Sequence, residues 1–173
     1  EFSGGVYNRP EVTVVNDEAR SYIRRSRETW DVVQAGYIDT YAATAAGAFS
    51  LTENTLYTVE AYEDYLRRLS PTGIIAIQRY YEEPPQQSIR LVSLALAALE
   101  RRGALDARRH IVVVRKDDRA SVLVKNIPFT ELDVTRIEQH CDSTGLELVA
   151  APGRPGTGLY GDLLATPDWR RVV

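Results

Sequence analysis

Hydrophobic and polar residues follow two kinds of pattern along this chain. Short runs rich in β-branched residues predict strands, each bounded by polar or glycine-containing turns, at 12–15, 30–35 and 73–78. Apolar positions that recur every three or four residues predict amphipathic helices, each with a buried and a solvated face, at 17–25, 51–69 and 89–102. Asn16 or Asp17 is placed to cap the first of these helices. The first half of the chain therefore predicts strands that alternate with helices.

The second half of the chain adds a hairpin to this alternation. Two apolar runs, 110–115 and 120–125, flank a short polar turn and predict an antiparallel pair. Thr130 caps a predicted helix that runs to residue 143, and a last strand, a loop and a helix follow at 146–150, 152–158 and 159–164. The pattern predicts an α/β fold with a mainly parallel sheet. Ligands of such sheets bind at the carboxyl ends of the strands, which here are residues 16–17, 36–39 and 78–81.

Composition and charge narrow the function classes. The chain has 173 residues, of which 44% are apolar and 26% charged, enough for one globular domain with a core. Its net charge of −3 argues against nucleic acid as a partner. A single cysteine, Cys141, excludes an internal disulfide, and with two histidines it offers no metal-ligand spacing. The apolar runs are too short for a membrane span. These observations predict a cytoplasmic domain without a metal.

One glycine-rich segment imitates a phosphate loop. Gly153, Gly156 and Gly158 lie between a predicted strand and a predicted helix. Their spacing is reversed relative to the dinucleotide fingerprint, and two prolines remove amides that would hold an anion. The sequence favours a plain connecting loop here.

Four sequence phrases resemble the polyamine aminopropyltransferase (spermidine synthase-like) family, which has the class I SAM-dependent methyltransferase fold. The phrases are Val12-Thr-Val-Val-Asn-Asp17, Trp30-Asp-Val-Val33, Leu66-Arg-Arg-Leu-Ser-Pro-Thr-Gly-Ile-Ile75 and Gly47-Ala-Phe-Ser-Leu-Thr-Glu-Asn-Thr-Leu-Tyr57. The resemblance covers residues 6–165. It implies a Rossmann-like sheet, mainly parallel, with a C-terminal antiparallel hairpin and lacking the first two strands. Residues 1–173 are then a single partial domain, the C-terminal portion of such a fold.

The resemblance also implies roles for individual residues. Asp17, with Asn16 beside it, matches the position that holds the adenine amino group of the cofactor; a helix cap is an equally good and compatible interpretation. Gly36 stands where the family has its catalytic Asp, and glycine cannot accept a proton. Asp39 is the nearest candidate base, although an Asx-turn role in the loop is favoured for it.

Further matches concern the substrate side of the site. Gln34 and Tyr37 are placed to position a substrate, and Gln78 matches a family glutamine at the end of a strand. Tyr80 stands where the family carries a Glu near the polyamine. These residues predict a binding site that departs from the usual pattern for a dicationic substrate.

The implied activity belongs to an intact parent protein. It is aminopropyl or methyl transfer from SAM or decarboxylated SAM to a small-molecule amine or another nucleophile. The glycine-rich first strand and the acid of the second strand do not occur before residue 12, so no cofactor binding and no activity are expected of this fragment.

An alternative function is a non-catalytic ligand-sensing or interaction module of a larger protein. Relatives of this type are often membrane-attached, so the domain is expected in the cytoplasm, either by itself or as the cytosolic part of a membrane-anchored bacterial protein. Strands that lack their neighbours expose sheet edges, which predicts a homodimer or a re-paired sheet.

Overall fold

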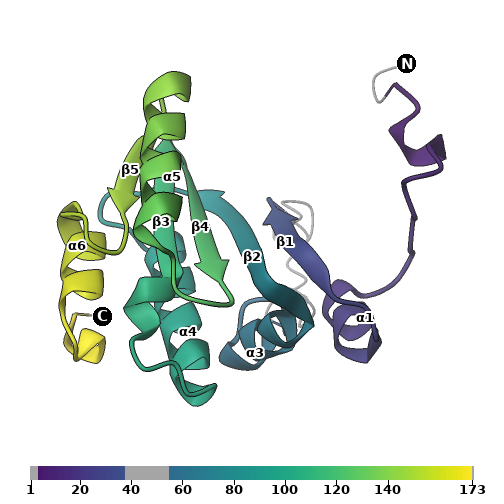
Figure 1. Ribbon diagram of the computed structural model, residues 1–173, viewed down its shortest axis with the longest axis horizontal. Coiled ribbons are helices and arrows are strands. Elements are labelled where there is room, and N and C mark those ends of the chain that lie inside the picture. The colour runs from purple at the N-terminus through teal and green to yellow at the C-terminus, as the bar shows by residue number, and fades with distance from the viewer. Residues whose placement is uncertain (1–3, 38–54, 173) are drawn as a thin grey trace, which may run out of the picture.

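The computed structural model describes residues 4–37 and 55–172, and these form an α/β fold with one five-stranded sheet (Figure 1). The candidate base Asp39 lies outside the described residues. The strand order is β1-β2-β4-β3-β5. The bounds of the strands are β1 Trp30–Gly36, β2 Leu69–Tyr80, β3 Ile111–Lys116, β4 Arg119–Lys125 and β5 Glu147–Ala150.

The sheet is mixed, which corrects the prediction of a mainly parallel one. Only β1 and β2 pair in parallel, whereas the pairings β2 with β4, β4 with β3 and β3 with β5 are all antiparallel. The reason is the predicted hairpin, which is confirmed: β4 folds back from β3 and lies between β3 and β2. A hairpin connection forces its two strands to run in opposite directions. β2 and β3 still point the same way.

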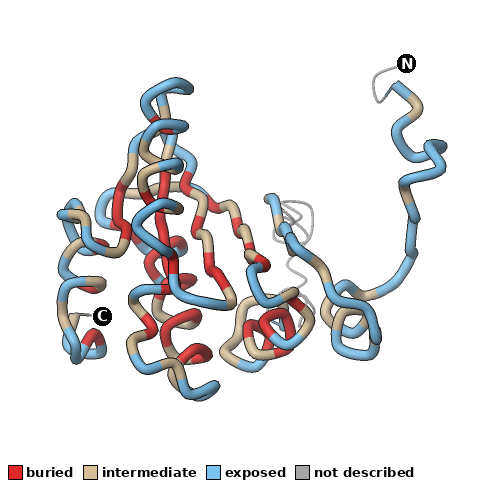
Figure 2. The backbone as a smooth tube through the Cα atoms, in the orientation of Figure 1, coloured by how far each residue is buried: buried red, intermediate tan, exposed pale blue. Residues whose placement is uncertain are grey.

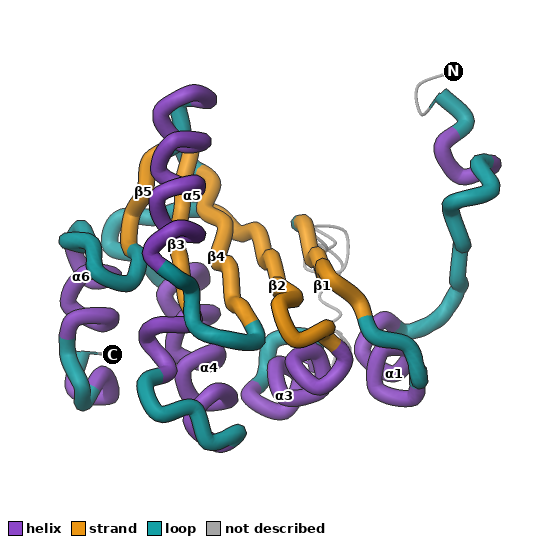
Figure 3. The backbone as a smooth tube through the Cα atoms, viewed as in Figure 1, coloured by secondary structure: helices purple, strands orange, loops and turns teal. Residues whose placement is uncertain are grey.

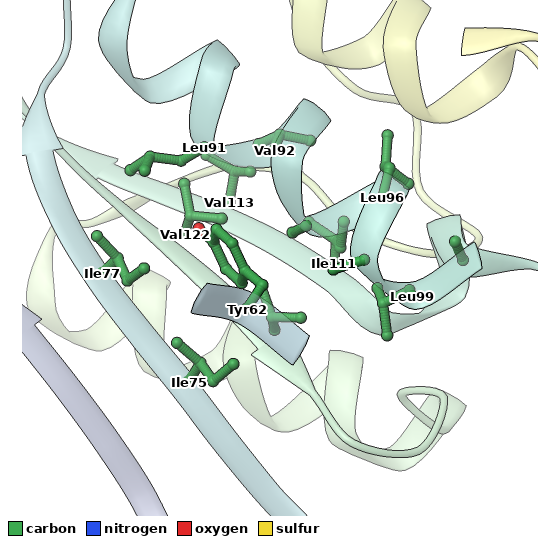
Figure 4. Close-up of a cluster of buried hydrophobic side chains, with 14 of the residues drawn as sticks. Tyr62, Ile75, Ile77, Leu91, Val92, Leu96, Leu99, Ile111, Val113 and Val122 are labelled. Carbon is green, nitrogen blue, oxygen red and sulfur yellow. The ribbon is translucent and has the colours of Figure 1, made fainter. Parts of the chain in front are cut away.

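Helices cover both faces of the sheet (Figure 3). One face packs against the larger core cluster, to which α3 (Val59–Arg68), α4 (Gln87–Arg101) and α6 (Gly158–Ala165) contribute. Tyr62 and Leu96 are fully buried there, against Ile77 and Val113 of the sheet (Figure 4). The other face packs against α5 (Glu131–Thr144) through a smaller cluster that includes Cys141. Short 3₁₀ helices occur at Val6–Asn8, Ala107–His110 and Trp169–Arg171.

The capping of α5 follows its local sequence. Thr130 is the N-cap and forms a capping box with Asp133, and Gly145 ends the helix in the left-handed conformation with a φ of 68°. A left-handed residue directly after a helix is a position that glycine adopts without steric cost. The predicted cap and helix are therefore confirmed.

The predicted strand at 12–15 is wrong. Residues 12–15 carry no strand pairing with any part of the chain that the structure describes, and Val14 and Val15 are 65% and 45% exposed. This segment leads away from the sheet, along the exposed stretch at the right of Figure 2. A β-branched run becomes a strand only where a neighbouring strand satisfies its backbone, and none is beside this one.

The helix that follows, α1 (Ala19–Arg25), is capped differently from the prediction. Its N-cap is Glu18, whose carboxylate accepts hydrogen bonds from the backbone amides of Arg20 and Ser21 at 3.0 and 2.8 Å. Neither Asn16 nor Asp17 caps it. The carboxylate of Asp17 instead accepts a bond from the amide of Glu18 at 2.8 Å and pairs with the Arg25 guanidinium.

Candidate functional site

The carboxyl ends of β1 and β2 lie side by side, as expected of parallel neighbours. Gly36 at the end of β1 is in register with Gln78 of β2. A Cβ atom on Gly36 would lie 3.0 Å from Oε1 of Gln78, closer than an ordinary van der Waals contact. The amide of Gln78 therefore occupies the space that a side chain at position 36 would fill. The absence of a side chain at position 36 leaves room for this amide.

Two tyrosines stand next to this amide. The rings of Tyr37 and Tyr80 lie 5.3 Å apart between centroids and are tilted by 59°. The hydroxyl of Tyr37 is buried and has no hydrogen-bond partner among the described residues, and burial raises the pKa of this phenol. Tyr37 also has a φ of 35°, in the left-handed region that non-glycine residues rarely enter. Such backbone strain persists only where surrounding contacts hold it, and it is frequent at binding sites.

The hairpin closes the same end of the sheet. Arg119, at the start of β4, is in register with Tyr80, and its guanidinium carbon lies 5.5 Å from the Tyr37 ring centroid. The amide of Tyr81 donates to the carbonyl oxygen of Asp118 at 2.7 Å, which fastens the hairpin turn to the end of β2. The site is therefore framed by three strands.

A buried arginine and several carboxylates set the charge of this end. Arg79 is only 6% exposed, and its guanidinium carbon lies 4.2 Å from the Tyr57 ring centroid. After Tyr81 the chain continues with two acids, of which Glu82 has a buried Oε2 atom without a hydrogen-bond partner among the described residues. Burial, and then a hydrogen bond with Glu83, raise the pKa of Tyr81 to about 12. A buried carboxylate oxygen without a donor favours a ligand that supplies one.

Three of the residues selected from the sequence meet here: Tyr37, Gln78 and Tyr80. We call these three, with Arg119, the carboxyl-end site. Gln34 lies two residues before Gly36, pairs with Ala76 and is exposed on the same face of the sheet as Gln78. Gln34 therefore lies closer to the middle of β1 and is not part of the carboxyl-end site.

Asp17 and Asn16 are not part of the carboxyl-end site. Asp17 lines a groove of about 310 Å³ together with Trp30 and Val32, at the amino-terminal half of β1. Its carboxylate is already paired with Arg25. Asn16 beside it is exposed. The described residues therefore do not fit SAM in the manner that the resemblance implies, because the carboxylate expected at the adenine is engaged elsewhere.

Sequence reasoning missed Arg119. Arg119 belongs to a hairpin turn that was predicted, but only the register between β2 and β4 shows that this turn reaches Tyr80.

Comparison with known proteins finds no family model that matches the chain and no significant match among curated proteins. Within the residues that the structure describes, no group of three or more His, Cys, Asp or Glu side chains is placed to hold a metal ion. No helix in the described ranges is both long and apolar enough to cross a membrane.

Proposed function

We propose that this chain is a spermidine synthase-like domain that binds a small organic amine, in its protonated form, at the carboxyl-end site. The observation that carries the proposal is the tilted pair of Tyr37 and Tyr80 beside the amide of Gln78. The sequence phrases described above, the parallel pairing of β1 with β2 and the antiparallel hairpin that follows support the family assignment.

The chemistry of these groups suits an ammonium ion. Tyrosine ring faces attract cations, and Arg119 already lies in this way at Tyr37. The carbonyl oxygen of Gln78 accepts hydrogen bonds, and an ammonium group has three N–H donors to offer it. A protonated amine would donate to the Gln78 oxygen and lie against the tyrosine rings.

We assign recognition of the amine to this site, and not alkyl transfer. Transfer from a sulfonium to an amine needs a group that takes the amine proton, and Gly36 supplies none. The described residues also do not place Asp17 where it could contact an adenine. The non-catalytic, ligand-sensing alternative is therefore the form of this family that the described geometry supports best.

Calorimetry with putrescine tests the assignment. We expect it to bind, and 1,4-butanediol, its neutral analogue, not to bind. The variants Tyr80→Ala and Gln78→Ala are expected to weaken binding about fivefold to tenfold each, because each removes one cation-binding or hydrogen-bonding group. The matched control is Tyr7→Ala. Tyr7 is an exposed tyrosine that is distant in sequence from the site residues, so this variant should bind like wild type. Equal affinity for the diol, or an unchanged affinity in both site variants, would contradict the proposal.

Gly36→Ala provides a more local test. Its new methyl group would displace only the flexible end of the Gln78 side chain, so the fold should be kept. We expect binding to fall about as much as in Gln78→Ala, with an unchanged unfolding midpoint. A variant that folds and binds putrescine normally would show that the Gln78 amide is not used.

A further inference from the structure

A second cavity lies at the opposite end of the sheet from the carboxyl-end site. It has a volume of about 510 Å³ and is bounded by the 3₁₀ helix Ala107–His110, the start of α5, the loop after β5 and α6. The strand register separates this cavity from Tyr37 and Tyr80. Lys125, at the end of β4 near the cavity, pairs with Ile74, and Ile74 lies at the other end of the β2–β4 pairing from Tyr80. Cavities of a few hundred Å³ are the size that holds small ligands.

The walls of this distal cavity combine apolar and charged side chains, and one of them is tightly built. Phe129, Val134 and Leu164 contribute side chains to it. The loop after β5 meets α6 through a contact of two glycines: a Cβ on Gly156 would lie 2.5 Å from the Cα of Gly161. This backbone contact, and not phosphate binding, explains the glycine at position 156 in the loop that imitates a phosphate loop. The wall it forms is therefore specified by the sequence.

One of the three arginines that line the distal cavity has no close carboxylate partner among the described residues. The other two are held by carboxylates. Arg108 donates to Asp106 at 2.8 and 3.0 Å, and Arg154 donates to Glu131 at 2.6 Å and to Glu138 at 2.7 and 2.8 Å. Bidentate pairs of this kind are geometrically well defined.

Arg109 is the third arginine, and its side chain has no hydrogen bond or ion pair with the described residues. Its backbone is fixed on both sides. The amide donates to the carbonyl oxygen of Asp106 at 3.2 Å, and its own carbonyl accepts from Phe129 at 2.8 Å. An exposed arginine with a fixed backbone therefore lines a cavity whose other arginines are paired with carboxylates.

We propose that the distal cavity binds a small organic monoanion, with an apolar body against Phe129 and a single carboxylate at Arg109. A carboxylate would give the Arg109 guanidinium the partner that it lacks, and Arg guanidinium groups bind carboxylates bidentately. An apolar body removes the cavity lining from water. The proposal is independent of amine binding, because it uses none of the residues of the carboxyl-end site.

Titration with 3-phenylpropionate, followed by ¹H–¹⁵N NMR spectra, tests the proposal. We expect shifts of the backbone signals of Arg109, Phe129 and Gly153, with those of Tyr37 and Gln78 unchanged. Arg109→Ala should weaken binding about tenfold and Arg109→Glu further, because each removes the charge-assisted bond. Arg102→Ala, at an exposed arginine after α4, is the matched control and should bind like wild type.

Two further probes identify the ligand class. The uncharged 3-phenylpropionamide should bind about tenfold more weakly than the carboxylate, and inorganic phosphate should produce no shifts at the cavity. Absence of shifts with the carboxylate, equal affinity of Arg109→Ala, or tighter binding of phosphate would each overturn the proposal. None of these results bears on putrescine binding, so the two assignments fail separately.

Discussion

Lys125 makes a close ion pair at the end of β4, and its side chain is only 9% exposed. Its ammonium lies 2.6 Å from Oδ2 of Asp133, and the same oxygen accepts bonds from the amide and the hydroxyl of Thr130, each at 2.8 Å. The Lys125 bond first, and the Thr130 amide next, lower the pKa of Asp133 to about 2. The pair thus fastens the end of β4 to the first turn of α5.

This pKa predicts an acid-sensitive contribution to stability. Because the folded-state pKa lies below the ordinary value, the contribution is present at neutral pH and is lost as the pH falls from about 4 toward 2. It amounts to about 2 kcal/mol. Asp133→Asn should lose about this much free energy of unfolding at pH 7 and flatten the acid limb of a urea-denaturation series.

Asp142→Asn, at an exposed position of the same helix, is the control and should behave like wild type. If Asp133→Asn were as stable as Asp142→Asn at pH 7, the buried pair would contribute nothing.

Residues that act through local contacts were predictable, and those that act across the fold were not. Thr130 was identified as a cap because its partner lies three residues away. The partner of Asp133 is on another element, and the ring of Tyr37 meets that of Tyr80 only because β1 and β2 pair. Tyr37, Gln78 and Tyr80 were still found, since each stands at a predicted strand end.

Elements with a strong pattern were predicted nearly to their ends, with β3, β4 and α5 as the best examples. The segment 12–15 has an equally strong strand pattern and is not a strand. The difference lies in strand pairing. β3 and β4 are joined by a short turn and form backbone hydrogen bonds with each other, whereas residues 12–15 would need a partner strand from a distant part of the sequence. β2 is longer than the predicted strand at 73–78. Ser70 to Thr72 were expected to form the turn that ends the preceding helix, but they are extended and belong to β2.

The close contact between the loop after β5 and α6 predicts that a larger residue at position 156 destabilises the fold. Gly156→Ala would force a methyl group against the backbone of Gly161, which a side-chain rotation cannot relieve. We expect a loss of about 1–3 kcal/mol in the free energy of unfolding, measured by urea denaturation. Pro155→Ala, at the neighbouring exposed position, should change stability little. A Gly156→Ala variant with wild-type stability would contradict the close contact.

The sheet has two edge strands, β1 and the shorter β5, and β1 is the longer open edge. No strand of the described ranges pairs with its outer edge, and Val32 on this strand is 60% exposed. Unpaired edges recruit further strands, so we expect self-association that increases with concentration in light-scattering measurements. Val32→Lys should shift the protein toward monomer, whereas Leu105→Lys, at another exposed apolar residue, should not. A wild-type protein that stays monomeric at every concentration would contradict this expectation.

The arrangement of the molecule places its two candidate binding regions at opposite ends of one sheet. The parallel pair of β1 and β2 brings Tyr37 and Tyr80 together, and the hairpin brings Arg119 to them. Sequence predicted the α/β class, but the mixed pairing and the position of Asp17 depended on long-range contacts.

Amine recognition is tested most directly by a ¹H–¹⁵N NMR titration with putrescine. The account predicts saturable shifts of the backbone signals of Gly36, Tyr37, Gln78 and Tyr80, and of the side-chain amide of Gln78. The signals of Arg109 and Phe129 should stay in place. Shifts confined to other regions, or none at the carboxyl-end site, would contradict the assignment.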